Sequence, residues 1–176
     1  MKVVVLCGGK GTRIRGVADD LPKPMIPIGP YPILWHIMRG YAAAGHKAID
    51  WRVTMAETGE ETLTGSRVKR IERYIGDDET FMLTYGDGVS DVDIAELAAF
   101  HKSHGKVMTV CGVRPPGRFG EMEHDETGAV IEFNEKPQAT GGRISGGFFV
   151  CDRRLFDYLD GGRDDVVLET EPMRRL

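Results

Sequence analysis

The stretch "KVVVLCGGKGTR", residues 2–13, decides how the rest of the sequence is interpreted. A β-branched apolar run stops at a pair of glycines, which is typical of a strand buried on both faces of a parallel sheet. Glycines lack a Cβ atom, so the backbone after this strand can turn sharply and present N–H groups to an anion. We therefore expect the first strand here, followed by a loop that can hold a phosphate.

Patterns typical of strands and helices alternate along the rest of the chain. Helices are predicted at 32–45, 66–76, 91–105 and 153–159. Strands are predicted at 51–56, 81–85, 106–113 and 146–152. A turn at "DETG" joins residues 121–124 and 129–136 into a hairpin. This order predicts an α/β fold with a mostly parallel sheet flanked by helices and an antiparallel hairpin near the C-terminus.

Composition and charge restrict the classes of function. The chain has 176 residues, 41% of them apolar, which predicts one domain over 1–176. Its net charge of −4 with interspersed signs does not favour a nucleic-acid or membrane partner. Cys7, Cys111 and Cys151 lie in apolar runs, as buried thiols of a reducing compartment do. The apolar run before Gly8 is too short for a signal peptide, so we expect a cytoplasmic protein.

The glycine turn does not fit the two commonest phosphate loops. "GGKGTR" lacks the spacing of a P-loop, and the third small residue of the dinucleotide fingerprint is replaced by Ile14. Thr12, Arg13 and Lys23 nevertheless supply the donors that a polyphosphate requires. Pro22 and Pro24 stiffen the segment that carries Lys23. A tight strand-to-helix turn without a ligand remains the alternative.

Three conspicuous stretches follow predicted strands: the turn after Leu6, "GDG" after Tyr85, and "EKP" after the hairpin. Ligands of α/β sheets bind beyond the carboxyl ends of the strands, so these stretches predict one site. Asp87 lies between two glycines at such an end and suits Mg²⁺, although an Asp-Gly turn is the alternative.

Several motifs together resemble the sugar-1-phosphate nucleotidyltransferases over nearly the whole chain. They are "GGKGTR", "PKPM", "PILWHIM", "TYGDGVSDVDI", "PPGRFG", "FNEKP" and "GGFFV". "TYGDGVSDVDI" and "PPGRFG" are similar to the cytidylyl branch of that family. The resemblance implies a Rossmann-like fold, Mg²⁺ as cofactor, and transfer of a cytidylyl group from CTP to α-D-glucose 1-phosphate, giving CDP-glucose and pyrophosphate.

The resemblance also implies roles for individual residues. Arg13 and Lys23 would act on the phosphates as catalytic residues, and Asp87 would ligate Mg²⁺. The nucleotide would be bound by Leu6, Cys7, Gly8, Gly9, Lys10, Gly11, Thr12, Arg13, Lys23, Thr62, Arg67 and Gly86. The sugar phosphate would be bound by Glu135, Lys136, Gly146 and Gly147.

The chain departs from the family pattern in four places. Leu21 stands where the family often has lysine, and Ser145 where it has asparagine. The resemblance implies a further strand and helix between Lys47 and Ala48, roughly forty residues that this chain lacks. A parallel crossover needs a connection of a dozen residues or more, which residues 47–50 cannot supply. The chain stops at Leu176, before the family's second metal-binding aspartate. We expect an incomplete domain, with residues missing near 47–50 and after 176; a naturally shortened member is the alternative.

Two other functions remain open on the residues. A nucleotide- or phosphosugar-binding regulatory subunit would keep the fold without turnover, as the departures from the pattern allow. An NAD-dependent oxidoreductase would need a third glycine and a distant acid that are not convincingly placed. We expect a homo-oligomer that uses CTP and glucose 1-phosphate as substrates.

Overall fold

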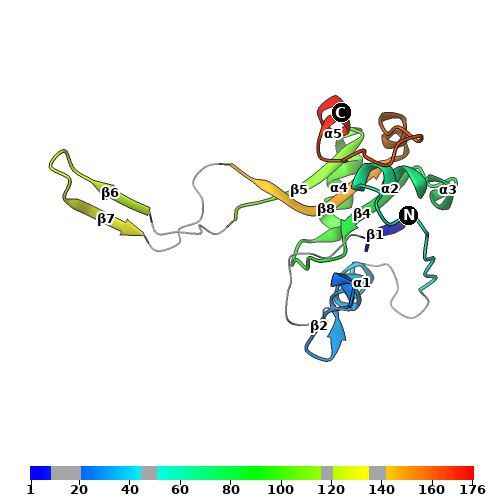
Figure 1. Ribbon diagram of the computed structural model, residues 1–176, viewed down its shortest axis with the longest axis horizontal. Coiled ribbons are helices and arrows are strands. Elements are labelled where there is room, and N and C mark those ends of the chain that lie inside the picture. The colour runs from blue at the N-terminus through cyan, green and yellow to red at the C-terminus, as the bar shows by residue number, and fades with distance from the viewer. Residues whose placement is uncertain (9–20, 45–50, 116–120, 135–141) are drawn as a thin grey trace. The chain divides into compact units, whose positions relative to one another are not determined.

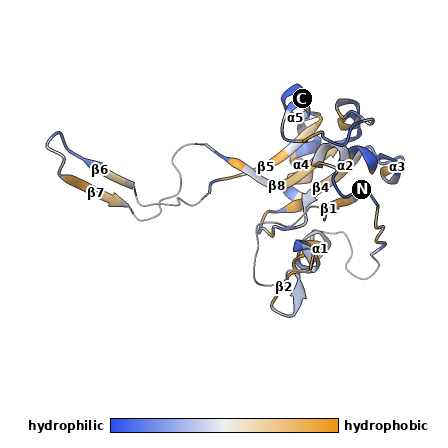
Figure 2. Cartoon of the chain, viewed as in Figure 1, coloured by the Kyte–Doolittle hydropathy of each residue, from blue (hydrophilic) through white to orange (hydrophobic). Residues whose placement is uncertain are grey.

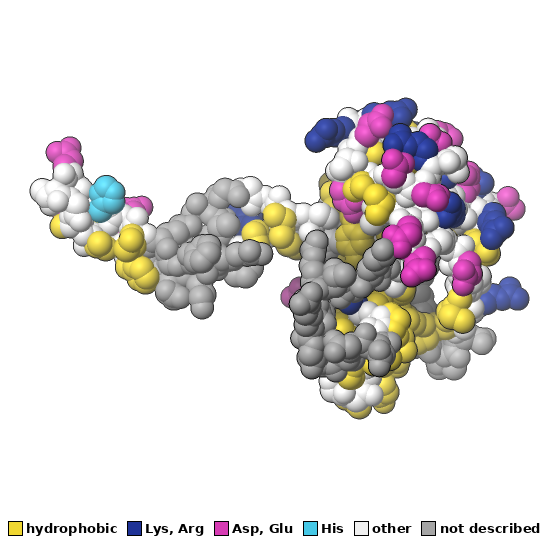
Figure 3. Space-filling view, in the orientation of Figure 1, with side chains coloured by type: hydrophobic (Ala, Val, Ile, Leu, Met, Phe, Trp, Pro, Cys, Tyr) yellow, Lys and Arg dark blue, Asp and Glu magenta, His cyan; other side chains and the backbone are white. Residues whose placement is uncertain are grey.

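The computed structural model describes residues 1–8, 21–44, 51–115, 121–134 and 142–176 (Figure 1). They form two compact units, one of Met1–Thr109 with Gly147–Leu176 and the other of Val110–Gly146. Among the described residues, no helix is long and apolar enough to cross a membrane. On the face seen in Figure 3, basic and acidic side chains are interspersed, as the sequence indicated.

A four-stranded sheet has the strand order β1-β4-β8-β5, and its strands β1 and β4 belong wholly to the first unit. These strands span Lys2–Leu6 (β1), Thr80–Tyr85 (β4), Met108–Val113 (β5) and Ile144–Asp152 (β8). β1 runs parallel to β4, and β8 runs antiparallel to β4. The sheet is therefore mixed, and the predicted α/β class and the predicted strands at its centre are confirmed.

Among the described residues, the first four α-helices form where local sequence signals predicted them, whereas the fifth was not predicted. They are α1 (Ile33–Ala43), α2 (Thr64–Arg70), α3 (Glu72–Ile75), α4 (Ile94–His104) and α5 (Glu171–Arg175). α4 begins at Asp93, whose side chain accepts a hydrogen bond from the Glu96 N–H, and ends at Gly105 in the left-handed conformation, φ +64°. α3 ends at Gly76, also at positive φ.

Short elements complete the first unit. They are the 3₁₀ turns η1 (Lys23–Met25) and η2 (Arg153–Tyr158) and the paired strands β2 (Pro27–Ile28) and β3 (Tyr31–Pro32). The helix predicted at 66–76 is divided into α2 and α3, and the helix predicted at 153–159 is the 3₁₀ turn η2.

The strand predicted at 51–56 is absent, and this prediction was wrong. Residues 51–59 have no regular structure, and the side chains of Trp51, Val53 and Met55 are exposed. β-propensity expresses packing against neighbouring strands, and no described strand pairs with this segment.

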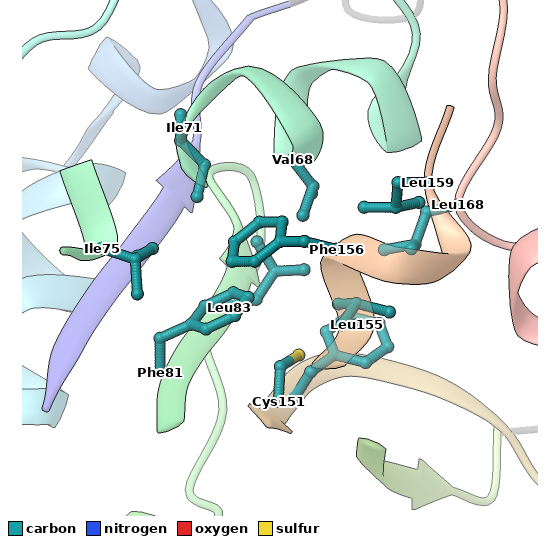
Figure 4. Packing of buried hydrophobic residues seen from close by; sticks show 11 residues of the cluster. Val68, Ile71, Ile75, Phe81, Leu83, Cys151, Leu155, Phe156, Leu159 and Leu168 are labelled. Atoms are coloured by element: carbon teal, nitrogen blue, oxygen red, sulfur yellow. The ribbon is translucent and has the colours of Figure 1, made fainter. Parts of the chain in front are cut away.

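The core of the first unit lies between the sheet and α2, α3 and η2 (Figure 4). The Phe81 ring on β4 stacks on the Phe156 ring of η2 with centroids 5.2 Å apart. Cys151 on β8 is fully buried, as predicted, whereas Cys111 is half-buried and Cys7 is exposed. The remaining buried members of this cluster are Val68, Ile71, Ile75, Leu83, Phe149, Leu155, Leu159 and Leu168.

The second unit contains the predicted hairpin, formed by β6 (Glu121–His124) and β7 (Val130–Asn134), which pair antiparallel. Its turn forms as predicted, because Asp125 Oδ1 accepts hydrogen bonds from the N–H groups of Thr127 and Ala129. Exposed apolar side chains remain on β7, which is coloured as hydrophobic in Figure 2.

Candidate active site

A cavity of about 130 Å³ lies where β1 and β4 end. Because the two strands are parallel and Leu6 pairs with Tyr85, the residues that follow them are held side by side. This is the edge at which the sequence predicted a ligand. The cavity is lined by Leu6, Cys7, Gly8, Lys23, Pro24, Thr64, Arg67, Tyr85, Gly86 and Asp87.

Two glycines make the close approach in this cavity possible. A Cβ atom at Gly8 would lie 2.2 Å from Nη1 of Arg67, so no larger residue fits beside the guanidinium. A Cβ atom at Gly86 would lie 2.8 Å from Cγ of Pro24 and 2.9 Å from the carbonyl oxygen of Leu6. The Gly86 N–H donates to that same carbonyl at 2.9 Å, which extends the β1–β4 pairing into the site.

Two cations line the cavity, and each is positioned differently. Arg67 is buried, and it donates from Nε to the Thr62 carbonyl at 2.7 Å and from Nη2 to the Glu60 carbonyl at 2.9 Å. A third bond joins Nη1 to Thr58 Oγ1 at 2.9 Å. These bonds fix the plane of the guanidinium. Lys23 belongs to η1, and its Nζ lies 3.6 Å from Asp87 Oδ2.

Asp87 is the single carboxylate among the lining residues, and its side chain is 52% exposed. No group of three or more His, Cys, Asp or Glu side chains that could hold a metal occurs among the described residues. Mg²⁺ in phosphate-binding sites is often held by one or two carboxylates, with waters and phosphate oxygens as the other ligands. Asp87 therefore fits the role of one oxygen ligand to such an ion.

Tyr85 and Cys7 complete the wall without offering a nucleophile. Burial, and then the hydrogen bond that its hydroxyl donates to Glu169, raise the pKa of Tyr85, so the phenol stays neutral. Cys7 is exposed as a whole, but neighbouring atoms partly desolvate its thiol and raise the pKa of that thiol. Among the described residues, Lys23 and Arg67 give the cavity the positive charge that suits an anionic ligand.

The structure brings together seven of the residues predicted for the site, namely Leu6, Cys7, Gly8, Lys23, Arg67, Gly86 and Asp87. Gly9, Lys10, Gly11, Thr12, Arg13, Glu135 and Lys136 lie outside the described residues. Gly146 belongs to the second unit, where a Cβ atom would lie 3.0 Å from Val113 Cγ1.

Thr62 and Gly147 belong to the first unit but do not line the cavity. Thr62 is buried behind it, and its hydroxyl accepts a hydrogen bond from Arg70 at 2.7 Å. Gly147 has φ +77°, and a Cβ atom there would lie 2.8 Å from Cδ2 of Tyr85. In this structure both residues support the wall.

Sequence reasoning missed three lining residues and one residue behind them. Pro24, Thr64 and Tyr85 line the cavity, and Glu169 accepts hydrogen bonds from Tyr85 and Thr64. Pro24 and Tyr85 are next to predicted residues, so their positions could have been inferred. Glu169 is far away along the chain, and no local motif marks it.

The sequence of the chain matches known proteins along nearly its whole length. A sequence model described as "Nucleotidyl transferase" matches residues 2–62 and 49–167. The chain belongs to the nucleotidyl transferase family. This nucleotidyl transferase is similar to glucose-1-phosphate cytidylyltransferase of Salmonella typhi, with 38% identity over 218 positions that cover all of the chain and 84% of the relative.

Two further similarities support the family assignment and the fold. A probable glucose-1-phosphate cytidylyltransferase of Bacillus subtilis is 36% identical, again over all of this nucleotidyl transferase and 84% of the relative. The crystal structure of HddC from Yersinia pseudotuberculosis superposes with a TM-score of 0.72, covering 99% of the chain and 86% of HddC at 23% identity. The latter similarity concerns the fold alone.

Proposed function

We propose that this nucleotidyl transferase moves a cytidylyl group from CTP to α-D-glucose 1-phosphate, releasing CDP-glucose and pyrophosphate. The observation that carries the proposal is the cavity at the ends of β1 and β4, which combines two cations, one carboxylate and two glycines. The choice of CTP and glucose 1-phosphate is supported by the names of the relatives at 36–38% identity.

The reaction needs little covalent chemistry from the protein. A phosphate oxygen of the sugar forms a bond to the α-phosphorus, the bond from that phosphorus to the bridging oxygen breaks, and pyrophosphate leaves with the electron pair. The attacking oxygen is ionised at neutral pH, so no general base is required. The protein contributes orientation of the phosphates and neutralisation of their charge.

The described residues fit these two tasks. Arg67, held in a fixed plane, can direct a planar pair of donors, whereas Lys23 is a compact charge on a flexible stem. Gly8 and Gly86 leave room for a phosphate close to the backbone. Mg²⁺ bound at Asp87 would supply further positive charge at the phosphate oxygens.

Pyrophosphate release tests the proposal directly. We expect release when the protein is mixed with CTP, glucose 1-phosphate and Mg²⁺, and much slower release with GTP, UTP or dTTP. Equal rates with another nucleotide would contradict the cytidylyl specificity but not the transferase. Binding of CTP without any release would favour the alternative, a nucleotide-binding regulatory subunit.

Asp87→Asn tests the metal site. The amide keeps the shape of the side chain but loses the charge that a hard cation needs, so the variant should require a higher Mg²⁺ concentration and turn over more slowly. Titrating Mg²⁺ against the rate of pyrophosphate release measures both effects. Asp91→Asn, a change in the exposed loop after the cavity, is the control. A variant at Asp87 that matches the wild-type titration would place the ligand elsewhere.

A further inference from the structure

Glu169 lies outside the cavity and yet contacts two of the residues that line it. Its Oε1 accepts a hydrogen bond from the Tyr85 hydroxyl, and its Oε2 accepts one from the Thr64 hydroxyl at 2.9 Å. Tyr85 ends β4, and Thr64 begins α2. One carboxylate thus joins two elements that are distant in sequence and form adjacent parts of the wall.

The segment before Glu169 holds the start of α2 by its backbone. Gly65 N–H donates to the Val166 carbonyl at 2.9 Å, and Leu168 N–H donates to Thr64 Oγ1 at 3.0 Å. A Cβ atom at Gly65 would lie 2.8 Å from Cγ1 of Val166, so this approach is close. α2 also carries Arg67. The position of that cation therefore depends on how residues 164–169 are held.

The Tyr85 ring is fixed on its other sides as well. It packs edge-to-face against the Phe149 ring with centroids 5.7 Å apart, and Gly147 allows the backbone to approach its edge. These contacts orient the ring but leave the hydroxyl to be oriented by Glu169. An ionised carboxylate only accepts hydrogen bonds, so it turns both the Tyr85 and Thr64 hydroxyl protons toward itself.

We propose that Glu169 is a positioning residue of the nucleotide site, which fixes Tyr85 and Thr64 together and thereby sets the wall beside Arg67. The inference rests on the proposed function. Because Glu169 does not line the cavity, it acts through other residues. Its loss should weaken nucleotide binding in the ground state and the transition state alike, which raises KM while kcat changes little.

The test compares Glu169→Ala and Glu169→Gln with the wild type. We expect Glu169→Ala to raise the Kd for CTP about five- to tenfold, because two hydrogen bonds to a charged group are lost. Glu169→Gln keeps one acceptor and should be intermediate. The same order is expected in KM, with kcat within about twofold. Glu171→Ala, at a neighbouring exposed glutamate that pairs with Arg175, should leave Kd and KM unchanged.

A double-mutant cycle with Tyr85→Phe separates positioning from a general loss of stability. If Glu169 acts through the tyrosine hydroxyl, the effects of Glu169→Ala and Tyr85→Phe on the Kd for CTP should not add. Full additivity, or a fall in kcat with an unchanged Kd, would overturn the proposal. Kd is measured by calorimetric titration without turnover, so it decides the role of Glu169 even if no pyrophosphate is released. A wild-type chain that neither binds CTP nor turns over would overturn both proposals.

Discussion

Individual residues of the site divide into those that contact the cavity and those that hold them. Lys23 and Asp87 were marked by motifs that are continuous in the sequence, and both line the cavity. Thr62 was expected at the nucleotide and instead receives hydrogen bonds from two arginine side chains, through its carbonyl and its hydroxyl. A motif specifies which residue is present, but the direction of its side chain depends on partners far along the chain.

Lys23→Ala should abolish transfer and leave the fold intact. The side chain is partly exposed and contributes one ion pair, which is worth little to stability, whereas its charge acts on phosphates in a partly dry site. Loss of such a donor should lower the rate on the order of 10²-fold or more. Pyrophosphate release and urea unfolding measure the two properties, with Lys102→Ala on the exposed face of α4 as the control. Unchanged turnover would remove Lys23 from the mechanism.

His101 should make the first unit less stable in mild acid. Its buried ring is next to Thr109 Oγ1 at 2.8 Å, and burial, with His104 nearby, lowers the pKa of His101 below its ordinary value of 6.5. Below about pH 6.5, His101 binds a proton in the unfolded chain but stays neutral in the native chain. The free energy of unfolding therefore falls as the pH drops through this range. Of the charged groups nearby, Asp152 opposes this shift and Arg154 adds to it.

Urea unfolding at pH 8 and pH 5.5 measures the effect of His101. The wild type should lose stability at pH 5.5, and His101→Gln, which cannot titrate, should lose less. Both values lie above the range in which carboxylates titrate, so acidic side chains contribute little to the difference. An identical pH dependence in the two proteins would assign the loss to other groups.

At the scale of elements, the sequence predicted what local chemistry determines. The glycine stops of α3 and α4, the acidic start of α4 and the "DETG" turn each depend on a few neighbouring residues, and all of them form. Two features depend instead on which strands become neighbours: the antiparallel direction of β8, and whether residues 51–56 form a strand. No local pattern contains that information, which is why one strand was predicted and did not form.

The end of α4 provides a test of local chemistry in isolation. Gly105 has φ +64°, and a Cβ atom there meets no described atom within 4 Å, so Gly105→Ala should cost about 1 kcal/mol by backbone strain alone. Gly40 lies within α1, and a Cβ atom there is equally unobstructed. Gly40→Ala should therefore stabilise the protein by about 0.5–1 kcal/mol. Urea unfolding measures both variants, and effects of the same sign would contradict this account.

At the scale of the whole molecule, the alignment bears on the expected gap. It spans 218 positions against 176 residues, so it is 42 positions longer than the chain. Residues 45–50, where the missing segment was expected, lie outside the described residues. We propose that a strand and helix of the family are absent there, which explains why Trp51, Val53 and Met55 lack cover. The expected homo-oligomer stays a prediction.

Insertion of a strand-and-helix segment of about 42 residues from the Salmonella typhi relative between Lys47 and Ala48 tests this proposal. A neighbouring strand would give residues 51–56 a hydrogen-bonded partner and bury their apolar side chains, so the urea midpoint should rise. A Gly/Ser linker of the same length is the control, since it adds chain without a strand. Equal midpoints for the two insertions would favour a naturally shortened protein whose fold needs no further strand.

The pairing of β4 has a consequence for how the chain acquires its structure. Phe81 at the centre of the sheet pairs with Lys2 on one side and with Cys151 on the other, so both ladders join positions that are far apart in sequence. To form such contacts, the chain must lose the conformational entropy of a long loop before the contacts stabilise the fold, and this slows folding. During synthesis on the ribosome, β4 cannot pair with β8 until β8 has been translated. Until then the side chains of Phe81, Met82 and Leu83, which are buried in the folded protein, are exposed, so chaperones or other unfolded chains can bind them.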